Sequence, residues 1–449
     1  MPFARTDPYR PAPASPKDRR NGRLAAALLW VMFVTYVYRI NEFFNAALID
    51  ERTIKLVLLF SGGLLVLGRL GGARLLLRNV NPYLLGFIAL GWLSILWSIE
   101  PALTTLRMLT FSTYALVLLI CCLYDWRPFR FQQLMRPLLL AVPLVSIAAW
   151  LIDPAFAIEE GDDIALRNSW RGVTGQKNTL GQLAAFSTML WMHAWLTRET
   201  GRAMAAFGLA ISFWAVLASR SSTALLASVP TCGFLWLLLR SPPSLKRYMP
   251  YISIAFALMV VTYSVAVLKL VPGLEMLLKP ITMLTGKDQT FSGRSVIWEI
   301  VSRHISFSPV LGTGFGAYWA GPQYPMSPSQ DVARAMYIYP FQAHNGYLDV
   351  INDLGYVGLM VLIGYMAVFM RHALALFRID RQQGALYLAM FFMVAISNLS
   401  QSIWFSGNIE FIVMLFATFA LGRITLDNRR LAALRAAEPP PPPVWQRRF

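Results

Sequence analysis

Residues 103–124 read LTTLRMLTFSTYALVLLICCLY, an almost uncharged run. A helix needs about 20 apolar residues to cross the hydrocarbon core of a bilayer, so a run of this length predicts a membrane span. Similar blocks recur along the 449-residue chain, which is 56% hydrophobic and 14% charged. Soluble domains carry about 25% charged residues. The composition therefore predicts a polytopic membrane protein and not a set of soluble domains.

The apolar blocks predict an all-α bundle of about twelve spans. These spans lie near residues 24–40, 54–69, 81–98, 103–124, 135–152, 178–197, 203–219, 222–240, 250–271, 347–371, 384–402 and 407–424. The bundle thus occupies residues 24–424. The two ends, residues 1–23 and 425–449, are rich in proline and basic residues and are predicted to be disordered tails. A basic tail without a small-residue cleavage site precedes the first span, so we interpret that span as retained.

The basic charge of the chain follows its predicted topology. The net charge of +17 could also suggest a nucleic-acid-binding protein. If the N-terminus is cytoplasmic and the spans alternate, the cytoplasmic segments hold 26 of the 40 Lys and Arg residues, as the positive-inside rule expects. We therefore predict two cytoplasmic termini, no nucleic-acid partner and tails that bind anionic membrane lipids, with a partner-binding proline motif as the alternative.

This topology leaves two long segments outside, residues 153–177 and 272–346. In the second segment, apolar side chains recur at helical spacing between residues 294 and 306, which predicts a helix on the outer membrane surface. The glycines of residues 312–316 lack the strand–helix unit of a dinucleotide site, so we interpret them as packing turns. The acidic cluster at residues 159–163 matches no calcium loop, and the three cysteines have no zinc spacing. We expect no metal.

Four basic residues lie on the outer side, against the charge bias. Arg171 and Lys177 precede a span, Arg220 lies in a short turn between two spans, and Arg294 opens the predicted surface helix. Arginine binds phosphate oxygens in a bidentate manner and stays charged at any relevant pH, so these residues indicate a phosphate-bearing lipid substrate. The alternative interpretation is that each side chain extends to the lipid headgroups.

His344 is one of four histidines and lies where the long outer segment meets the tenth predicted span. Its ordinary pKa near 6.5 suits it to accept a proton at neutral pH, while packing or helix capping is the alternative role. Asp349 could orient the ring if the helix begins before it. Few ionisable residues fall at mid-span, which argues against a proton or ion relay. The chain also lacks two related halves, which argues against a transporter or flippase.

Taken in order, these segments resemble the bacterial O-antigen ligase and polymerase superfamily, and within it the exopolysaccharide polymerases. The matching segments are RGVTGQKNTLG at 171–181, SRS at 219–221, SGR at 292–294 with Trp298, PVLGTGFG at 309–316, AHNGY at 343–347 and GYVG at 355–358. The resemblance implies a metal-independent glycosyltransferase without a cofactor. It would act at the periplasmic face of the bacterial inner membrane on a glycan carried by a polyprenyl diphosphate.

The resemblance also implies roles for individual residues. The residues that would bind the donor diphosphate are Arg171, Arg220, Arg294 and, in support, Lys177. The residues expected to support the same site are Asn178, Ser221, Asn345 and Tyr347. His344 would assist the acceptor hydroxyl as a base, while the arginines stabilise charge on the leaving diphosphate.

The implied reaction joins lipid-linked repeat units into an exopolysaccharide. Its expected partners are the lipid-linked donor, a glycan acceptor, membrane lipids and chain-length regulators. The alternative function is a ligase that transfers a finished glycan to lipid A core or to a protein. Product length would separate the two, since a polymerase makes a ladder from one donor and a ligase makes a single transfer.

Overall fold

The computed structural model of this chain describes residues 15–48, 50–159, 168–242, 294–336 and 339–437, with isolated positions between 244 and 262. The helices before residue 160 are α1 (Pro16–Val37), α2 (Ile40–Phe43), α3 (Glu51–Leu67), α4 (Leu70–Leu77), α5 (Pro82–Leu93), the 3-10 turn η1 (Ser94–Leu96), α6 (Pro101–Leu123), α7 (Arg130–Ile152) and α8 (Pro154–Ala157). Those after it are α9 (Lys177–Thr197), α10 (Arg202–Ala218), α11 (Ser222–Arg240), α15 (Arg294–Ile305), α16 (Ser329–Met336), α17 (Gly346–Ile379), α18 (Arg381–Ser397) and α19 (Ile409–Ala437). Strands β1 (Ile158–Glu159) and β2 (Ser169–Trp170) form one short antiparallel pair.

The all-α prediction is confirmed, and every predicted span in the described part of the chain coincides with a helix. Among the described residues, five helices are long and apolar enough to cross a membrane, or six if α3 and α4, which are bent by 96°, form one span. The chain is therefore a multi-pass membrane protein. The predicted ninth span, residues 250–271, and the first part of the long outer segment lie outside the described residues, so the number twelve stays a prediction.

The helices extend further toward both termini than expected. Residues 16–23 and 425–437, expected to belong to disordered tails, are helical. Ser15 caps α1 through the backbone N–H of Asp18, whose carboxylate pairs with Arg69 at 2.8 Å. Near the other terminus, Arg429 donates to the side-chain oxygen of Asn79 at 2.8 Å. Tertiary contacts of this kind order segments that composition alone describes as tails. The remaining tail residues, 1–14 and 438–449, lie outside the described residues.

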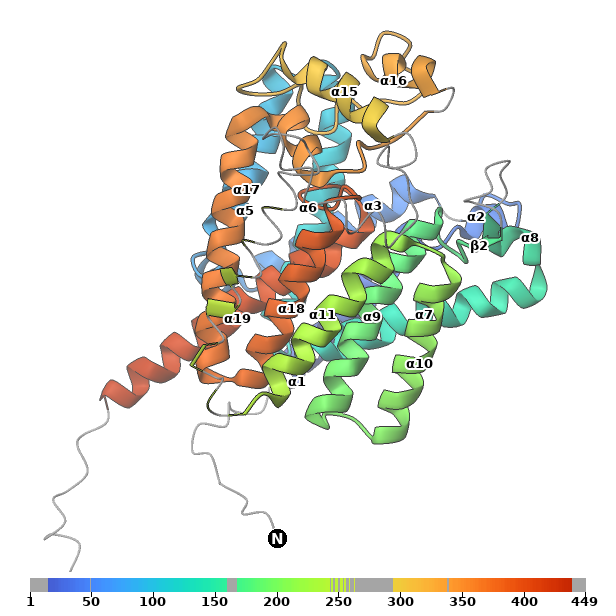
Figure 1. Cartoon of the computed structure of the whole chain (residues 1–449). Helices are drawn as coiled ribbons and strands as arrows, with labels where there is room; N and C mark the ends of the chain where they lie inside the picture. The colour runs from blue at the N-terminus through green and yellow to red at the C-terminus, as the bar shows by residue number, and fades with distance from the viewer. Residues whose placement is uncertain are drawn as a thin grey trace, which may run out of the picture.

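The core of the bundle is built from helices that are buried on all sides. α18 has nearly every side chain buried and α9 has most of them buried, as expected for helices in the middle of a bundle. α9 packs against α7, α10 and α11, and α18 packs against α11 and α17 (Figure 1). The connection between α18 and α19, residues 398–408, is also largely buried. We refer to it below as the α18–α19 connection.

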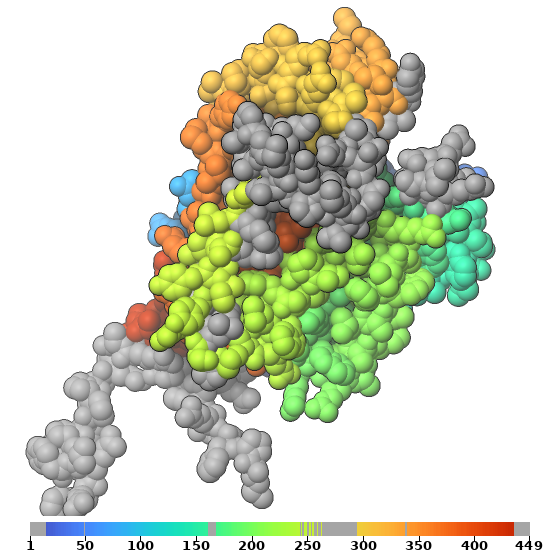
Figure 2. Space-filling view, viewed as in Figure 1, coloured from blue at the N-terminus to red at the C-terminus, as the bar shows by residue number. Residues whose placement is uncertain are grey.

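A cap of residues 294–336 covers one end of the bundle. α15 and α16 lie over the ends of α5, α6 and α17 in Figure 1, and they form the yellow and orange end of the molecule in Figure 2. α15 is the helix that the periodicity of residues 294–306 predicts. The cap has a small core of its own, made by Ile297, Val301, Tyr318, Trp319, Val332, Ala343 and Leu348. Through Ala343 and Leu348, this second core reaches the start of α17.

α17 is broken at Gly355, and the cap joins the chain at that break. Gly355 has φ 64° and ψ −164°, and a Cβ there would lie 2.2 Å from the backbone of Val310. The break frees the N–H of Tyr356 to donate to the carbonyl of Pro309 at 2.8 Å. On the other side of the break, Thr313 N–H donates to the carbonyl of Asn352 at 3.0 Å. The glycine-rich stretch 312–316 therefore consists of packing turns.

Candidate functional site

The residues just before α17, among them His344, are held by hydrogen bonds from the cap and from α17 itself. The N–H of Ala343 donates to Asp349 Oδ2 at 2.9 Å, and its carbonyl accepts from Trp298 Nε1 at 2.9 Å. Trp319 Nε1 donates to the other oxygen of Asp349 at 2.8 Å. His344 has φ 53°, a left-handed conformation that costs a non-glycine residue about 1 kcal/mol or more. Asp349, a candidate for orienting the ring, accepts instead from the backbone of Ala343 and from the side chain of Trp319.

The residues that follow His344 attach this segment to the α18–α19 connection. Asn345 caps α17 by accepting from the N–H of Tyr347 at 3.1 Å. The N–H of Gly346 donates to the carbonyls of Asn398 and Gln401, each at 3.0 Å. A Cβ on Gly346 would lie 1.8 Å from Asn398 Oδ1, so the close approach requires glycine. The hydroxyl of Tyr347 reaches the carbonyl of Ala395 at 3.2 Å. Asn345 and Tyr347 thus fix the position of His344.

Arg294 and His344 are electrostatically coupled in a poorly solvated region under the cap. Burial lowers the pKa of Arg294 to about 10. Burial, together with the charge of Arg294, lowers the pKa of His344 to about 3, so the ring is neutral at neutral pH. Neither a hydrogen bond nor an ion pair joins Arg294 to any residue that the structure describes. A desolvated cation that lacks a carboxylate is costly, and an anionic ligand would offset that cost.

Unpaired hydrogen-bond donors surround the same histidine. The side-chain nitrogens of Asn345 and Gln401 are buried and have no partner among the described residues. Gln342 lies between His344 and Gln401, with its amide nitrogen 3.3 Å from His344 Nδ1 and 3.3 Å from Gln401 Oε1. Most buried polar atoms in proteins are paired, so unpaired donors in one place need an explanation. Phosphate or sugar oxygens would pair with them.

The turn between α10 and α11 forms the second part of the site. Arg220 is exposed in this turn, with φ 49°. The hydroxyl of Ser221 donates to Asn178 Oδ1 at 2.9 Å, so two residues expected to support the site are in contact. Two residues further, Thr223 Oγ1 lies 2.7 Å from the hydroxyl of Ser400. The Arg220 turn and the His344 segment therefore both contact the α18–α19 connection.

The structure places Arg171 and Lys177 in another cluster, around the short strand pair. Arg171 Nε donates to the carbonyl of Phe156 at 3.0 Å, and the side chain lies close enough to Arg39 for mutual repulsion. Lys177 Nζ is 3.3 Å from the hydroxyl of Ser169. Asn178 is the next residue of α9, so this cluster adjoins the Arg220 turn through the chain. Arg171 and Lys177 thus lie together, in a cluster that contains neither Arg220 nor Arg294.

Two site residues, Gln342 and Gln401, were not recognised from the sequence. Gln401 falls at the end of the predicted span 384–402, and a glutamine beside Ser402 and Ser400 is an unusual end for an apolar block. These polar residues at the end of an apolar block could have indicated a site. Gln342 carried none, because its role depends on a residue 59 positions away.

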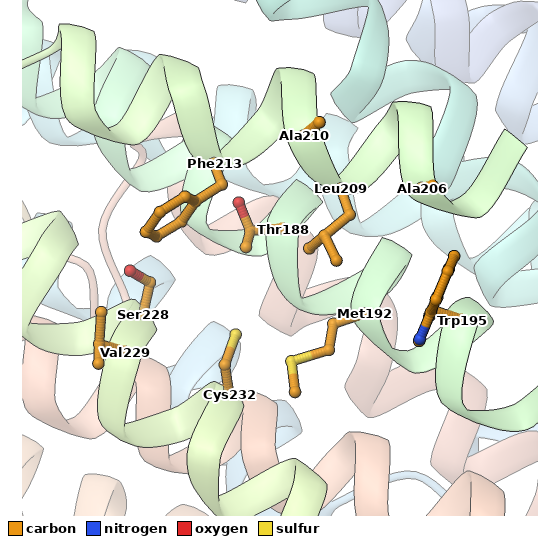
Figure 3. A pocket seen from close by; sticks show the side chains of 10 residues that line it. All are labelled: Thr188, Met192, Trp195, Ala206, Leu209, Ala210, Phe213, Ser228, Val229 and Cys232. Atoms are coloured by element: carbon orange, nitrogen blue, oxygen red, sulfur yellow. The ribbon is translucent and has the colours of Figure 1, made fainter. Parts of the chain in front are cut away.

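An apolar cavity of about 430 Å³ lies between the middles of α9, α10 and α11 (Figure 3). Met192, Leu209, Phe213 and Cys232 line it, among others. Ser228, a polar residue on its wall, uses its hydroxyl to bond the carbonyl of Leu225. Its lining is mostly apolar, so the cavity suits an apolar chain better than a glycan or a phosphate. Among the described residues, no group of three or more His, Cys, Asp or Glu side chains could hold a metal ion.

Comparison with known proteins gives one family match and one curated relative. Residues 207–363 match the model of the O-antigen ligase family. The relative is the exopolysaccharide production protein ExoQ of Rhizobium meliloti (strain 1021), which is 24% identical over 297 residues. The alignment covers 64% of this chain and 65% of the relative, just under two thirds of its length. The family match over residues 207–363 contains Arg220, Arg294 and His344 but not Arg171. The resemblance that the sequence motifs indicated is confirmed.

Proposed function

We propose that this multi-pass membrane protein, which matches the O-antigen ligase family over residues 207–363, is a membrane glycosyltransferase that polymerises lipid-linked repeat units into an exopolysaccharide. The donor would be a polyprenyl-diphosphate-linked glycan, and the reaction would take place at the periplasmic face of the inner membrane. The name of the curated relative favours exopolysaccharide as the product. Transfer of a finished glycan to lipid A core or to a protein is the second candidate, which the family description favours.

One observation supports this proposal above the others. Arg294 is a poorly solvated guanidinium beside a neutral histidine, with no carboxylate partner among the described residues. A guanidinium of this kind binds phosphate oxygens in a bidentate manner. The unpaired amide nitrogens of Asn345 and Gln401 add neutral donors in the same region. A ligand with both phosphate and sugar oxygens satisfies the two sets of donors together.

The chemistry that such a site can perform is a single displacement at the anomeric carbon. The acceptor oxygen forms a bond to C1 while the bond from C1 to the diphosphate oxygen breaks, and the electron pair leaves on the diphosphate. Arg294, and Arg220 from the turn between α10 and α11, would stabilise the charge that grows on the leaving oxygens. The proton of the acceptor hydroxyl must also leave. A single displacement inverts the configuration at C1 and needs no nucleophilic side chain.

The test uses the purified protein in lipid nanodiscs, supplied with lipid-linked repeat units as both donor and acceptor. We expect a ladder of products from the wild type and little product from His344→Ala, Arg294→Ala or Arg220→Ala. Arg303→Ala is the matched control, since Arg303 lies on α15 but is exposed and pairs with Glu299. Normal ladders from all three variants would contradict the site assignment. A single product that forms only when lipid A core is added would identify a ligase.

A further inference from the structure

The orientation of the Gln342 side chain is fixed by a backbone group. Its Oε1 accepts from the N–H of Ser402 at 3.3 Å, and a backbone N–H can only donate. The amide nitrogen must therefore lie on the other side, where it is 3.3 Å from Gln401 Oε1 and 3.3 Å from His344 Nδ1. Exchanging the oxygen and nitrogen would place the NH₂ group against the N–H of Ser402.

This orientation determines which nitrogen of His344 carries the proton. An amide NH₂ is a donor only, so His344 Nδ1 must be the acceptor and holds no proton. A neutral imidazole has one proton, which must then be on Nε2. The ring is neutral at neutral pH, as described above. His344 Nε2 has no hydrogen-bond partner among the residues that the structure describes, so its N–H is available to a ligand.

We propose that Gln342 is a positioning residue that holds His344 in the Nε2–H form, so that His344 donates a hydrogen bond to a phosphate oxygen of the substrate and does not act as a base. This inference rests on the proposed function and assigns the role of its central residue. A base at Nε2 would need the opposite form of the ring, in which Nδ1–H faces the NH₂ of Gln342. A base at Nδ1 would need Gln342 to leave Ser402 and Gln401.

The donor role gives a balanced reaction. The acceptor oxygen bonds to C1, the bond from C1 to the diphosphate oxygen breaks, and the electron pair stays on that oxygen. His344 Nε2–H and Arg294 stabilise the developing charge without transferring a proton. The acceptor proton passes to the departing diphosphate, which is the strongest base that the reaction itself creates nearby. A neutral imidazole with a lowered pKa is known to serve as such a donor in enzymes.

The first test compares His344→Gln with His344→Ala in the polymerisation assay. The glutamine amide can donate a hydrogen bond but cannot accept a proton at neutral pH. We expect His344→Ala to lose about 100-fold in rate, as for removal of a fixed donor, and His344→Gln to recover about tenfold or more of that loss. If His344→Gln is as slow as His344→Ala, the donor role is overturned while the site assignment stands. If His344→Ala has the normal rate, the site assignment itself fails.

The second test changes Gln342. A carboxylate in Gln342→Glu accepts from Nδ1–H and so moves the ring proton from Nε2 to Nδ1. In protein labelled with ¹⁵N-histidine, we expect an unprotonated Nδ1 for His344 at pH 7 in the wild type and a protonated Nδ1 in Gln342→Glu. The His344→Gln spectrum identifies the signal. Gln342→Glu should also lose most of its activity. A wild-type spectrum with protonated Nδ1, or a fully active Gln342→Glu, would overturn the inference.

Discussion

Two Arg–His pairs lie in poorly solvated regions at opposite ends of this molecule, and they differ in one component. Arg136, at 4% exposure, and His193, at 0%, share the carboxylate of Glu199. The other ring nitrogen of His193 lies 2.9 Å from the carbonyl of Gln382. Arg294 and His344 have the same residue types but no carboxylate among their described contacts.

We propose that this difference separates a structural cluster from a ligand site. In the Arg136 cluster, charges are matched within the chain, so removing one member leaves another unpaired. In the Arg294 cluster, no carboxylate among the described residues matches the charge, so we expect a bound anion to stabilise the folded protein. Sites that bind ligands commonly carry a cost in stability. The residue types alone would not distinguish the two clusters.

The largest effect is expected for Arg136→Met, in stability. Removing the arginine leaves the carboxylate of Glu199 unpaired in a region of low solvation, which costs about 3–5 kcal/mol for a buried pair. Equilibrium unfolding in mixed micelles measures the loss. The double variant Arg136→Met with Glu199→Gln should recover most of it, and the transfer rate per folded molecule should stay normal in both. If Arg136→Met is as stable as the wild type, the Arg136 cluster does not stabilise the fold.

Replacing Arg294 by Met should have the opposite effect to Arg136→Met: a lower transfer rate without a loss of stability. Arg294→Met is expected to lower the transfer rate by about 100-fold, the cost of removing a fixed stabiliser of transition-state charge. Its melting temperature should equal or exceed that of the wild type, because a poorly solvated charge without a partner is removed. Initial rates and thermal unfolding are measured on one preparation, with Arg303→Met as control. Reduced stability with a normal rate per folded molecule would make Arg294 structural.

A smaller effect is expected where the His344 segment meets the α18–α19 connection. In Gly346→Ala the new methyl group would overlap Asn398 Oδ1, and overpacking of this kind costs about 1–3 kcal/mol. The connection would shift, so the rate should fall as well. Gly407→Ala is the matched control, since Gly407 lies in the same connection and a Cβ there meets nothing within 4 Å. Equal stability and rate in the two variants would contradict the close contact.

The smallest effect concerns pH. The pKa of His344 is about 3 in the folded protein and near 6.5 in the unfolded chain. Between these values the unfolded chain binds a proton that the folded protein does not, so stability falls as the pH is lowered below 6.5. His344→Gln removes this contribution and should lose about 0.7 kcal/mol less than the wild type between pH 7 and pH 6. If the stabilities of the wild type and His344→Gln fall in parallel as the pH is lowered, the His344 ring is well solvated.

The helices could be predicted because apolar length and helical spacing are local properties of the sequence. The surface helix at Arg294 and the packing turns at residues 312–316 followed from periodicity and glycine content in the same way. The contact between Asn178 and Ser221 also lay within reach, since two neighbouring helices end there.

The rest depended on contacts between distant residues. The role of Gln342 requires Gln401 and Ser402, and the order of the tail helices requires Arg69 and Asn79. Arg171 was grouped with Arg294 because both are basic and external by topology. The structure gives Arg171 a backbone partner and another arginine as its neighbour instead. Charge and topology predict which residues face one side, but they do not predict which of them meet.

The break in α17 bears on how this molecule can change over evolutionary time. Most of the hydrogen bonds that join the cap to α17 there, from residues 309–314 to residues 352–357, run between main-chain groups, and the hydroxyl of Thr313 adds one to the carbonyl of Asn352. This attachment requires glycine at positions 312, 314 and 355, and the buried side chains of Trp298 and Trp319 add hydrogen bonds to the start of α17. Substitutions on the outer face of the cap can therefore accumulate without detaching it. The surface that would meet new acceptors is thus free to diversify while the histidine beneath it stays in place.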